Sequence, residues 1–269
     1  METETKNNIT YVTLNNYYNK PKFQNKTILI TGGSSGIGYA TAKLCIEEGA
    51  KVIITGRNIE KLKTAQEKLG TNAFISQFDM ADTKAIDSKF DLLYEKFGVI
   101  NHLVCNAGCP SLKKGFNDID EEEWERIMSV HLRGNYFLMR KFYNAMLFHN
   151  LQGNIVAVSS NGAFCGHLIP YGIAKAGLNN YIKGLAKISI ERGIRCNGVA
   201  PGYTVTNIFD ERGTFPGLSA DGNLYKGDIR GKRFHLPEEI AGVILFLLSD
   251  ASSSINGQII KCDSGDTIL

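Results

Sequence analysis

The sequence predicts one α/β domain with a doubly wound sheet of about seven parallel strands and helices on both faces. Three observations favour this fold. From Lys26 onward, short apolar runs alternate with segments of helical periodicity. The runs are apolar throughout, as expected for strands that are covered on both sides. A glycine-rich turn follows the first run. Strands that alternate with helices pair in parallel through right-handed crossovers.

The elements follow an N-terminal arm. Residues 1–25 are rich in Asn and Thr and show no sustained period, so we interpret them as an arm that is flexible or lies on the surface, before a domain over 26–269. Gly49 ends the first helix, whose apolar side carries Ala40, Leu44 and Cys45. We expect strands over 27–31, 52–55, 73–78, 102–105, 154–159, 195–199 and 258–262. We expect helices over 37–48, 58–69, 83–97, 121–149, 170–191 and 237–249.

The composition narrows the class of protein. With 43% hydrophobic residues in 269, the chain can bury a sizeable core. The net charge of +3 is spread over scattered basic residues, which argues against a nucleic-acid partner. The most apolar stretch, Ile240–Leu248, is too short to span a membrane, and no signal peptide is evident. The six cysteines show no metal-ligand spacing, so we expect no metal and a reducing, cytoplasmic location.

The turn after the first strand has the pattern of a phosphate-binding loop. It reads Thr-Gly-Gly-Ser-Ser-Gly-Ile-Gly over 31–38, so that backbone amides of a strand–turn–helix unit can approach a pyrophosphate. Simple packing is the alternative explanation for such a turn. The predicted cofactor contacts here are Gly32, Ser34, Ser35, Gly36, Ile37 and Gly38.

The end of the second strand indicates which dinucleotide is bound. An NAD site has an acidic residue here for the ribose hydroxyls, whereas this chain has Arg57 and no carboxylate over 55–58. An arginine can pair with a 2′-phosphate, so we predict NADP(H) as the cofactor and keep NAD(H) as the alternative. The explanation without a function is that Arg57 is simply an exposed residue at the start of a helix. After the third strand, Asp79 and Met80 can flank the adenine, although aspartate is also a common helix cap.

A tyrosine and a lysine four residues apart suit proton transfer to a carbonyl oxygen. Tyr171 and Lys175 share one helical face, and the lysine ammonium stabilises the phenolate form of the tyrosine. Ser160, at the end of the fifth strand, can hydrogen-bond the substrate oxygen. A tyrosine and a lysine at this spacing often occur by chance. In a chain that also has a phosphate-binding turn and a strand that ends in Ser-Ser, the pair predicts an enzyme that exchanges a hydride and a proton with its substrate.

Together these motifs resemble the short-chain dehydrogenase/reductase family, in its single-domain form of approximately 250 residues. The resemblance runs from about Thr27 to Asp263 and includes Asn106-Ala107-Gly108, the segment Arg195–Gly202 and Pro237–Ala241. It implies a Rossmann-like fold with Tyr171 as acid/base, Lys175 as its activator and ribose ligand, and Ser160 as substrate donor. It further implies cofactor contacts at Asn106, Ala107, Gly108, Tyr171, Lys175, Pro201, Gly202, Thr204 and Thr206.

Two departures from the family pattern stand out. The family usually has an asparagine, whose main-chain carbonyl anchors a water of the proton relay, where this chain has His131. We therefore expect His131 to be catalytic, through its carbonyl or as an additional titrating group, with simple packing as the alternative. The loop from Ser160 to Tyr171 is also shorter than is common, so Ser159 is an alternative donor.

The substrate side gives less information. Residues 207–236 are glycine-rich and charged, and they lie where the family has a flexible substrate lid. We predict an NADP(H)-dependent oxidoreductase that interconverts a secondary alcohol and a ketone. The expected substrate is a small ketone, a sugar or a polyol, and the expected assembly is a homodimer or homotetramer. An NAD(H)-dependent enzyme and a non-catalytic NADP-sensing protein are the alternatives. A sugar-nucleotide epimerase ranks low, because its phosphate turn has a different glycine spacing.

Overall fold

The computed structural model describes residues 3–6, 9–12, 22–113, 115–206 and 234–268, with only the backbone for the first two ranges. Its main feature is a seven-stranded sheet in the order β5-β4-β3-β6-β7-β8-β9, and every neighbouring pair is parallel. This confirms the predicted doubly wound fold. The strands are β3 (Thr27–Thr31), β4 (Lys51–Gly56), β5 (Ala73–Gln77), β6 (His102–Cys105), β7 (Gly153–Val158), β8 (Ile194–Pro201) and β9 (Ile259–Cys262).

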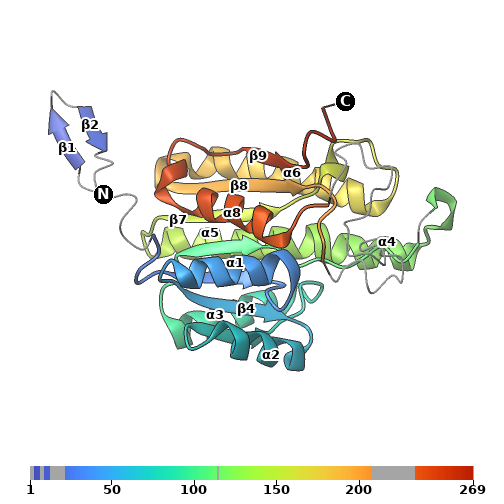
Figure 1. Cartoon of the computed structure of the whole chain (residues 1–269), viewed down its shortest axis with the longest axis horizontal. Helices are drawn as coiled ribbons and strands as arrows, with labels where there is room; N and C mark the ends of the chain where they lie inside the picture. Colours follow the sequence, from blue (N-terminus) through green and yellow to red (C-terminus); the bar gives the residue numbers. More distant parts are fainter. Residues whose placement is uncertain (1–2, 7–8, 13–21, 114, 207–233, 269) are drawn as a thin grey trace, which may run out of the picture.

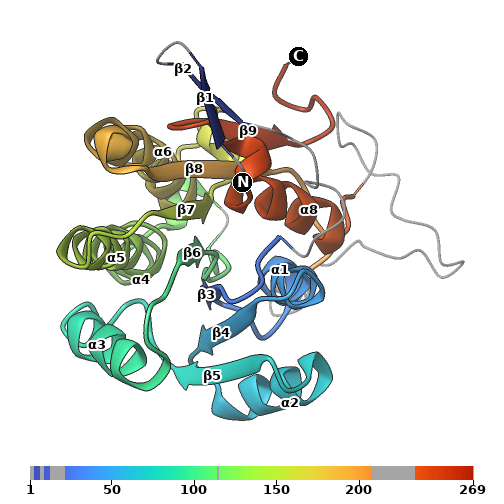
Figure 2. The same cartoon turned by 90° about the vertical axis from the view of Figure 1, so that its left-hand side faces the viewer.

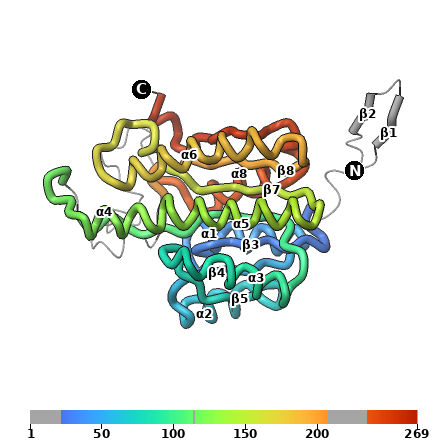
Figure 3. Tube along the Cα trace, turned by 180° about the vertical axis from the view of Figure 1, so that it is seen from behind, coloured from blue at the N-terminus to red at the C-terminus, as the bar shows by residue number. Residues whose placement is uncertain are grey.

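Helices cover both faces of this sheet (Figure 1, Figure 2). One face carries α1 (Gly36–Glu47), α2 (Ile59–Leu69) and α8 (Pro237–Leu248). The other carries α3 (Ile86–Phe97), α4 (Glu121–Met128), α5 (Asn135–Phe148) and α6 (Pro170–Ser189). Figure 3 shows α5 running between α6 and α3 across this second face. Each face therefore has its own apolar core, as strands buried on both sides require.

The N-terminal region contains a short hairpin and a core residue. Strands β1 (Thr3–Lys6) and β2 (Ile9–Val12) pair antiparallel in a sheet of their own. Phe23 lies within the range that we assigned to the arm, but its side chain is buried and its ring packs edge-on against His102 at 5.7 Å. Lys22 pairs with Glu48 at the end of α1. The core of the domain thus begins before residue 26.

The helix predicted over 121–149 is three consecutive segments, because a π-helical turn, η2 (Ser129–Gly134), separates α4 from α5. Such turns add a residue and are frequent at functional sites. Gly134 lets this turn approach the loop that follows β5, since a Cβ atom on Gly134 would collide with the main-chain oxygen of Met80. The side-chain amide of Asn135 donates to the main-chain oxygen of His131 at 2.9 Å.

The sheet has a switch point between β3 and β6. From these neighbours the chain continues in opposite directions along the sheet, to β4 and β5 on one side and to β7, β8 and β9 on the other. Ligands of doubly wound sheets bind at the carboxyl ends of the strands beside such a point. Here those ends are Thr31 and Cys105.

Candidate active site

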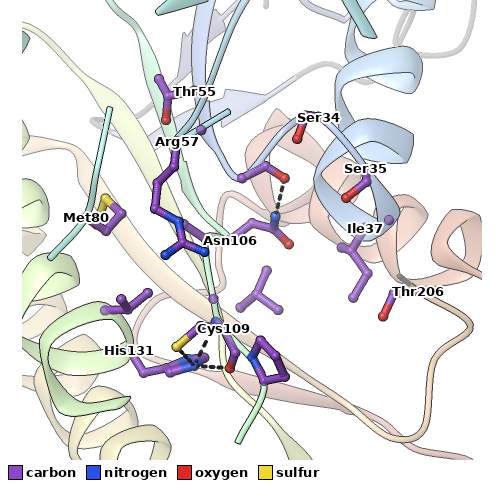
Figure 4. Close-up of a pocket in the computed structure, with 18 of the residues that line it drawn as sticks. Ser34, Ser35, Ile37, Thr55, Arg57, Met80, Asn106, Cys109, His131 and Thr206 are labelled. Carbon is purple, nitrogen blue, oxygen red and sulfur yellow. Dashed lines mark hydrogen bonds between the residues drawn. The ribbon is translucent and has the colours of Figure 1, made fainter. Parts of the chain in front are cut away.

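A cavity of about 670 Å³ lies at the carboxyl ends of the strands. Figure 4 shows residues from the glycine-rich turn, the β4 end and the region around His131 pointing into one space. Every predicted site residue lines it except Gly38. The lining residues that were not predicted from the sequence are Thr55, Gly56, Asn58, Lys61, Phe78, Val130 and Val158.

The glycine-rich turn presents the N-terminus of α1 to this cavity. Gly36 has a φ of +55°, and a Cβ atom on it would lie 3.1 Å from the Thr206 side chain. The first residues of α1 line the cavity, so the main-chain amides and the positive dipole end of this helix face it. No acidic side chain in the first turn of α1 offsets this positive end. Gly38 lies behind the turn, because a Cβ atom there would collide with the main-chain oxygen of Gly32 and the Asn106 side chain. It allows close helix packing and does not line the cavity.

Asn106 connects the two strands of the switch point. Its side-chain amide donates to the main-chain oxygens of Thr31 and Gly32, each at 3.0 Å. The Thr31 hydroxyl accepts the main-chain N–H groups of Asn106 and Ala107, also at 3.0 Å. These four bonds fix the floor of the cavity between the glycine-rich turn and the end of β6.

Two cations lie where β4 meets α2. Arg57 is exposed at the end of β4, Lys61 follows it by four residues at the start of α2, and both line the cavity. The Asn58 side chain caps α2 by accepting the N–H of Lys61 at 3.0 Å. Gln77 holds the main-chain oxygen of Arg57 at 2.8 Å. The sequence analysis missed Lys61, although the spacing of four from Arg57 on a predicted helix was the available signal.

Asp79 is the one carboxylate among the described lining residues. Its side chain accepts the N–H of Ala81 at 2.9 Å, which is the local turn-capping role that we considered as an alternative to adenine binding. Met80 beside it is buried and also lines the cavity.

The predicted catalytic residues also line this cavity. Lys175 is buried, and its Nζ atom donates to the main-chain oxygen of Val158 at 2.6 Å. The same Nζ atom lies 5.9 Å from the centre of the Tyr171 ring. Burial lowers the pKa of Lys175 to about 8. The Lys175 ammonium thus lies beside the Tyr171 phenol, and burial destabilises its charged form.

Both serines at the end of β7 line the cavity. The Ser160 hydroxyl accepts the N–H of Gly162 at 3.1 Å and so caps the short helix η3 (Asn161–Ala163). The Ser159 hydroxyl is buried without a partner among the described residues. Both therefore stay candidates for the substrate donor.

His131 is buried beside the cavity. Only 1% of the residue is exposed, and burial, together with the nearby Lys175 charge, lowers its pKa to about 3. This direction favours the neutral imidazole, and a role of His131 in catalysis stays a prediction. Its Nε2 atom lies 2.9 Å from the main-chain oxygen of Cys109 and 3.1 Å from the main-chain nitrogen.

The β6–α4 loop forms the wall next to His131. Cys109 and Pro110 line the cavity, whereas the nearby Phe164, His167 and Tyr203 do not. Residues 207–233 of the predicted lid lie outside the described residues.

The two ends of that lid segment are joined at its base. Thr204 and His235 form a parallel bridge, and the N–H of Val205 donates to the oxygen of His235 at 2.9 Å. The N–H of His235 donates to the oxygen of Tyr203 at 2.8 Å, and its ring nitrogen Nε2 lies 2.8 Å from the hydroxyl of Ser264.

Among the described residues, no group of three or more His, Cys, Asp or Glu side chains is arranged to hold a metal ion. Within the same ranges, no helix combines the length and apolarity needed to cross a bilayer.

Comparison with known proteins finds relatives over most of the chain. The family model described as enoyl-(acyl carrier protein) reductase matches residues 32–267. A 3-oxoacyl-(acyl-carrier-protein) reductase FabG of Aquifex aeolicus is 34% identical over 91% of this chain and 98% of its own. A glucose 1-dehydrogenase of Gluconobacter oxydans is 32% identical over 93% of this chain and 94% of its own. A short-chain dehydrogenase/reductase structure from Mycobacterium marinum superposes with a TM-score of 0.84 at 28% identity, covering 92% and 98% of the two chains.

The chain belongs to the short-chain dehydrogenase/reductase family, a class of oxidoreductases with a Rossmann fold and a nicotinamide cofactor. This membership supports oxidoreduction of the alcohol–ketone type.

Proposed function

We propose that the protein is an NADP(H)-dependent oxidoreductase that interconverts a secondary alcohol and a ketone, with Tyr171 as acid/base. One observation carries this proposal. A single cavity is lined by two cations from the β4–α2 junction, Arg57 and Lys61, and by a tyrosine–lysine pair from α6. Two positive side chains at the predicted ribose end favour a 2′-phosphate over free ribose hydroxyls.

The residues present fit a dinucleotide. The α1 amides behind Gly36 and Ile37 would hold the pyrophosphate, because they are unpaired donors at a helix N-terminus without acidic neighbours. Arg57 and Lys61 would hold the 2′-phosphate. Met80 would pack against the adenine, and Lys175 would bind the nicotinamide ribose with the two N–H donors that Val158 leaves free. Pro201, Gly202, Thr204 and Thr206 would line the nicotinamide.

Three side chains carry the proton chemistry. A bound nicotinamide supplies or accepts the hydride at the carbonyl carbon. Tyr171 gives its phenolic proton to the carbonyl oxygen as negative charge develops there, and it takes a proton in the reverse direction. The Lys175 ammonium, 5.9 Å from the phenol ring, stabilises the resulting phenolate. Ser160 donates a hydrogen bond to the same oxygen, with Ser159 as the alternative donor.

For the substrate we propose a small ketone, a sugar or a polyol. Relatives of similar identity carry the names glucose 1-dehydrogenase and gluconate 5-dehydrogenase, which supports the polyhydroxylated class. Others are named 3-oxoacyl-(acyl-carrier-protein) reductase, so a 3-oxoacyl thioester belongs in the same substrate panel.

The decisive experiment is a fluorescence titration of the purified protein with NADPH and with NADH at matched salt. Tighter binding of NADPH, followed by NADPH oxidation with a member of the ketone panel, supports the proposal. Preference for NADH would favour the NAD-dependent alternative. Tight NADPH binding without turnover of any substrate would favour the sensing protein.

A homo-oligomer and a cytoplasmic location also belong to the proposal. Apolar side chains are exposed along α5 and α6, including Tyr136, Phe148, Ile173 and Ile188, and they suit a contact between copies. Light scattering after size-exclusion chromatography gives the oligomeric state.

All six cysteines are free thiols, which fits a reducing compartment. Cell fractionation tests this location.

A further inference from the structure

We propose that the His131 side chain is a positioning residue for Tyr171: its ring, fixed on the main chain of Cys109, holds the phenol in the orientation that exchanges the proton. This inference rests on the proposed role of Tyr171 as acid/base. It assigns to the imidazole a task that needs no change of its protonation state.

The two rings are in an edge-to-face arrangement. Their centres lie 5.0 Å apart and their planes cross at 82°. This is one of the favoured geometries of aromatic pairs, and it restricts the tilt of the partner ring. Tyr171 is the second residue of α6 and follows a loop whose Leu168 is 68% exposed. A ring at the start of a helix, next to an exposed loop, gains its orientation from such a contact.

His131 is itself held on its other side. The Nε2 atom bonds to the main chain of Cys109. The ring also lies over Gly108, where an added Cβ atom would be 2.8 Å from the imidazole Cε1. With Cys109 on one side and Tyr171 on the other, the ring has little room to change its rotamer.

The loop that holds His131 is anchored to α4 by a partly buried ion pair. Glu123 is 3% exposed and lies 2.7 Å from Arg126. Arg126 donates to the main-chain oxygen of Pro110 at 2.6 Å, and Glu123 accepts the N–H of Leu112 at 2.8 Å. A continuous set of contacts therefore leads from this ion pair through the Cys109 loop and His131 to Tyr171.

A neutral imidazole suits this position. A protonated ring would place a second cation near the Lys175 ammonium in a buried site, where like charges repel strongly. Burial keeps the ring uncharged, so it can contact Tyr171 without competing with Lys175 for the phenolate.

The test compares two replacements of His131 with a matched control. His131→Asn removes the ring, and His131→Phe keeps a ring without the bond to Cys109. His102→Asn is the control, because His102 is also a buried histidine with a pKa lowered to about 3, but it does not line the cavity. The readouts are kcat, KM and the pH profile of ketone reduction, and the Kd for NADPH.

We expect His131→Asn to lower kcat about tenfold, as the loss of an aromatic contact and of phenol orientation predicts, with the Kd for NADPH within about twofold. His131→Phe should recover most of the rate, and His102→Asn should keep it within about twofold. The pH profiles should keep their shape. An unchanged kcat in His131→Asn, or equal losses in His131→Asn and His102→Asn, would overturn the proposal. The proposal would also be overturned if the wild-type pH profile showed a titration near pH 6.5 that His131→Asn lacks, since His131 would then act as an acid/base group.

A second readout needs no activity. With 3-fluorotyrosine incorporated, the ¹⁹F resonance of residue 171, assigned by its absence in Tyr171→Phe, reports ring mobility in the cofactor-free protein. His131→Asn should change its transverse relaxation, and His102→Asn should not. If wild-type protein binds NADPH but reduces no ketone, the proposed function fails while this signal still decides the role of His131. Unchanged relaxation in His131→Asn would refute that role even in an active enzyme.

Discussion

The Nζ atom of Lys175 donates to the main-chain oxygen of Val158 at 2.6 Å. This bond ties helix α6, which carries Tyr171, to the end of β7, which carries Ser159 and Ser160. The two serines, the phenol and the ammonium are therefore held by one strand and one helix that this bond connects, and a lysine on a flexible loop would not fix them in this way.

The pH dependence of ketone reduction follows from Lys175. Its pKa is lowered to about 8, so the ammonium is present below that pH and is lost above it. We expect kcat/KM for reduction to fall as the pH rises through about 8, because the developing phenolate loses its neighbouring cation. Lys175→Arg, which stays charged, should remove this decline even if its absolute rate is lower. A profile of wild-type protein that stays flat between about pH 7 and about pH 10 would contradict the prediction.

Replacement of Tyr171 tests the acid/base directly. We expect Tyr171→Phe to lower kcat by about 10²- to 10⁴-fold, because the substrate oxygen loses its proton donor. The Kd for NADPH should change by no more than about twofold, since the ring is kept. Stopped-flow turnover and fluorescence titration measure the two quantities. Near-wild-type activity would refute the mechanism.

The two serines can be separated by single substitutions. Loss of one donor to a developing oxyanion lowers kcat by about 10²- to 10³-fold. We expect Ser160→Ala to show this loss and Ser159→Ala to stay close to the wild-type rate. The reverse pattern in a steady-state assay would assign the substrate bond to Ser159, whose hydroxyl is buried without a described partner.

Cofactor choice depends on the two cations at the β4 end. Arg57→Ala and Lys61→Ala should each weaken NADPH by about tenfold to a hundredfold, the cost of a charge-assisted bond to a phosphate. Binding of NADH should change by no more than about twofold. Lys63→Ala is the control, since Lys63 lies on the same helix, pairs with Glu60 and does not line the cavity. Equal losses for NADPH and NADH in titration would show that these residues do not read the 2′-phosphate.

Stability should fall in acid because of the two buried histidines. Burial lowers the pKa of both His102 and His131 to about 3, against an unfolded value of about 6.5. Between these values the unfolded chain binds more protons, so the free energy of unfolding falls with decreasing pH, by up to about 1.4 kcal/mol per histidine and pH unit. His102→Asn should remove one histidine's share of this slope in urea unfolding. A slope equal to that of the wild type would contradict the assignment.

The sheet could be predicted from the sequence because its strands are uninterrupted apolar runs between helical segments. The glycine-rich turn and the Tyr171–Lys175 pair were equally visible, since their spacing is local. The features that escaped prediction depend on distant contacts. The π-helical turn follows from the approach of Gly134 to Met80, and the same residues read as an ordinary helix in sequence.

Other misses have the same cause. Burial of Phe23 depends on His102 and on the core beneath α1. The protonation state of His131 depends on the elements packed around it, and no spacing rule reports that burial. The Glu123–Arg126 pair reads as an ordinary exposed helix pair until its contacts with Pro110 and Leu112 are known.

The bridge between Thr204 and His235 has a consequence for how such a protein can diversify. The bridge joins the chain after β8 to the chain before α8, outside the main sheet. The free-energy cost of closing a loop between two fixed ends grows only slowly with the length of the loop. We therefore expect changes of length in the segment that the sequence assigns to a lid to leave Asn106, Lys175 and the register of the strands in place.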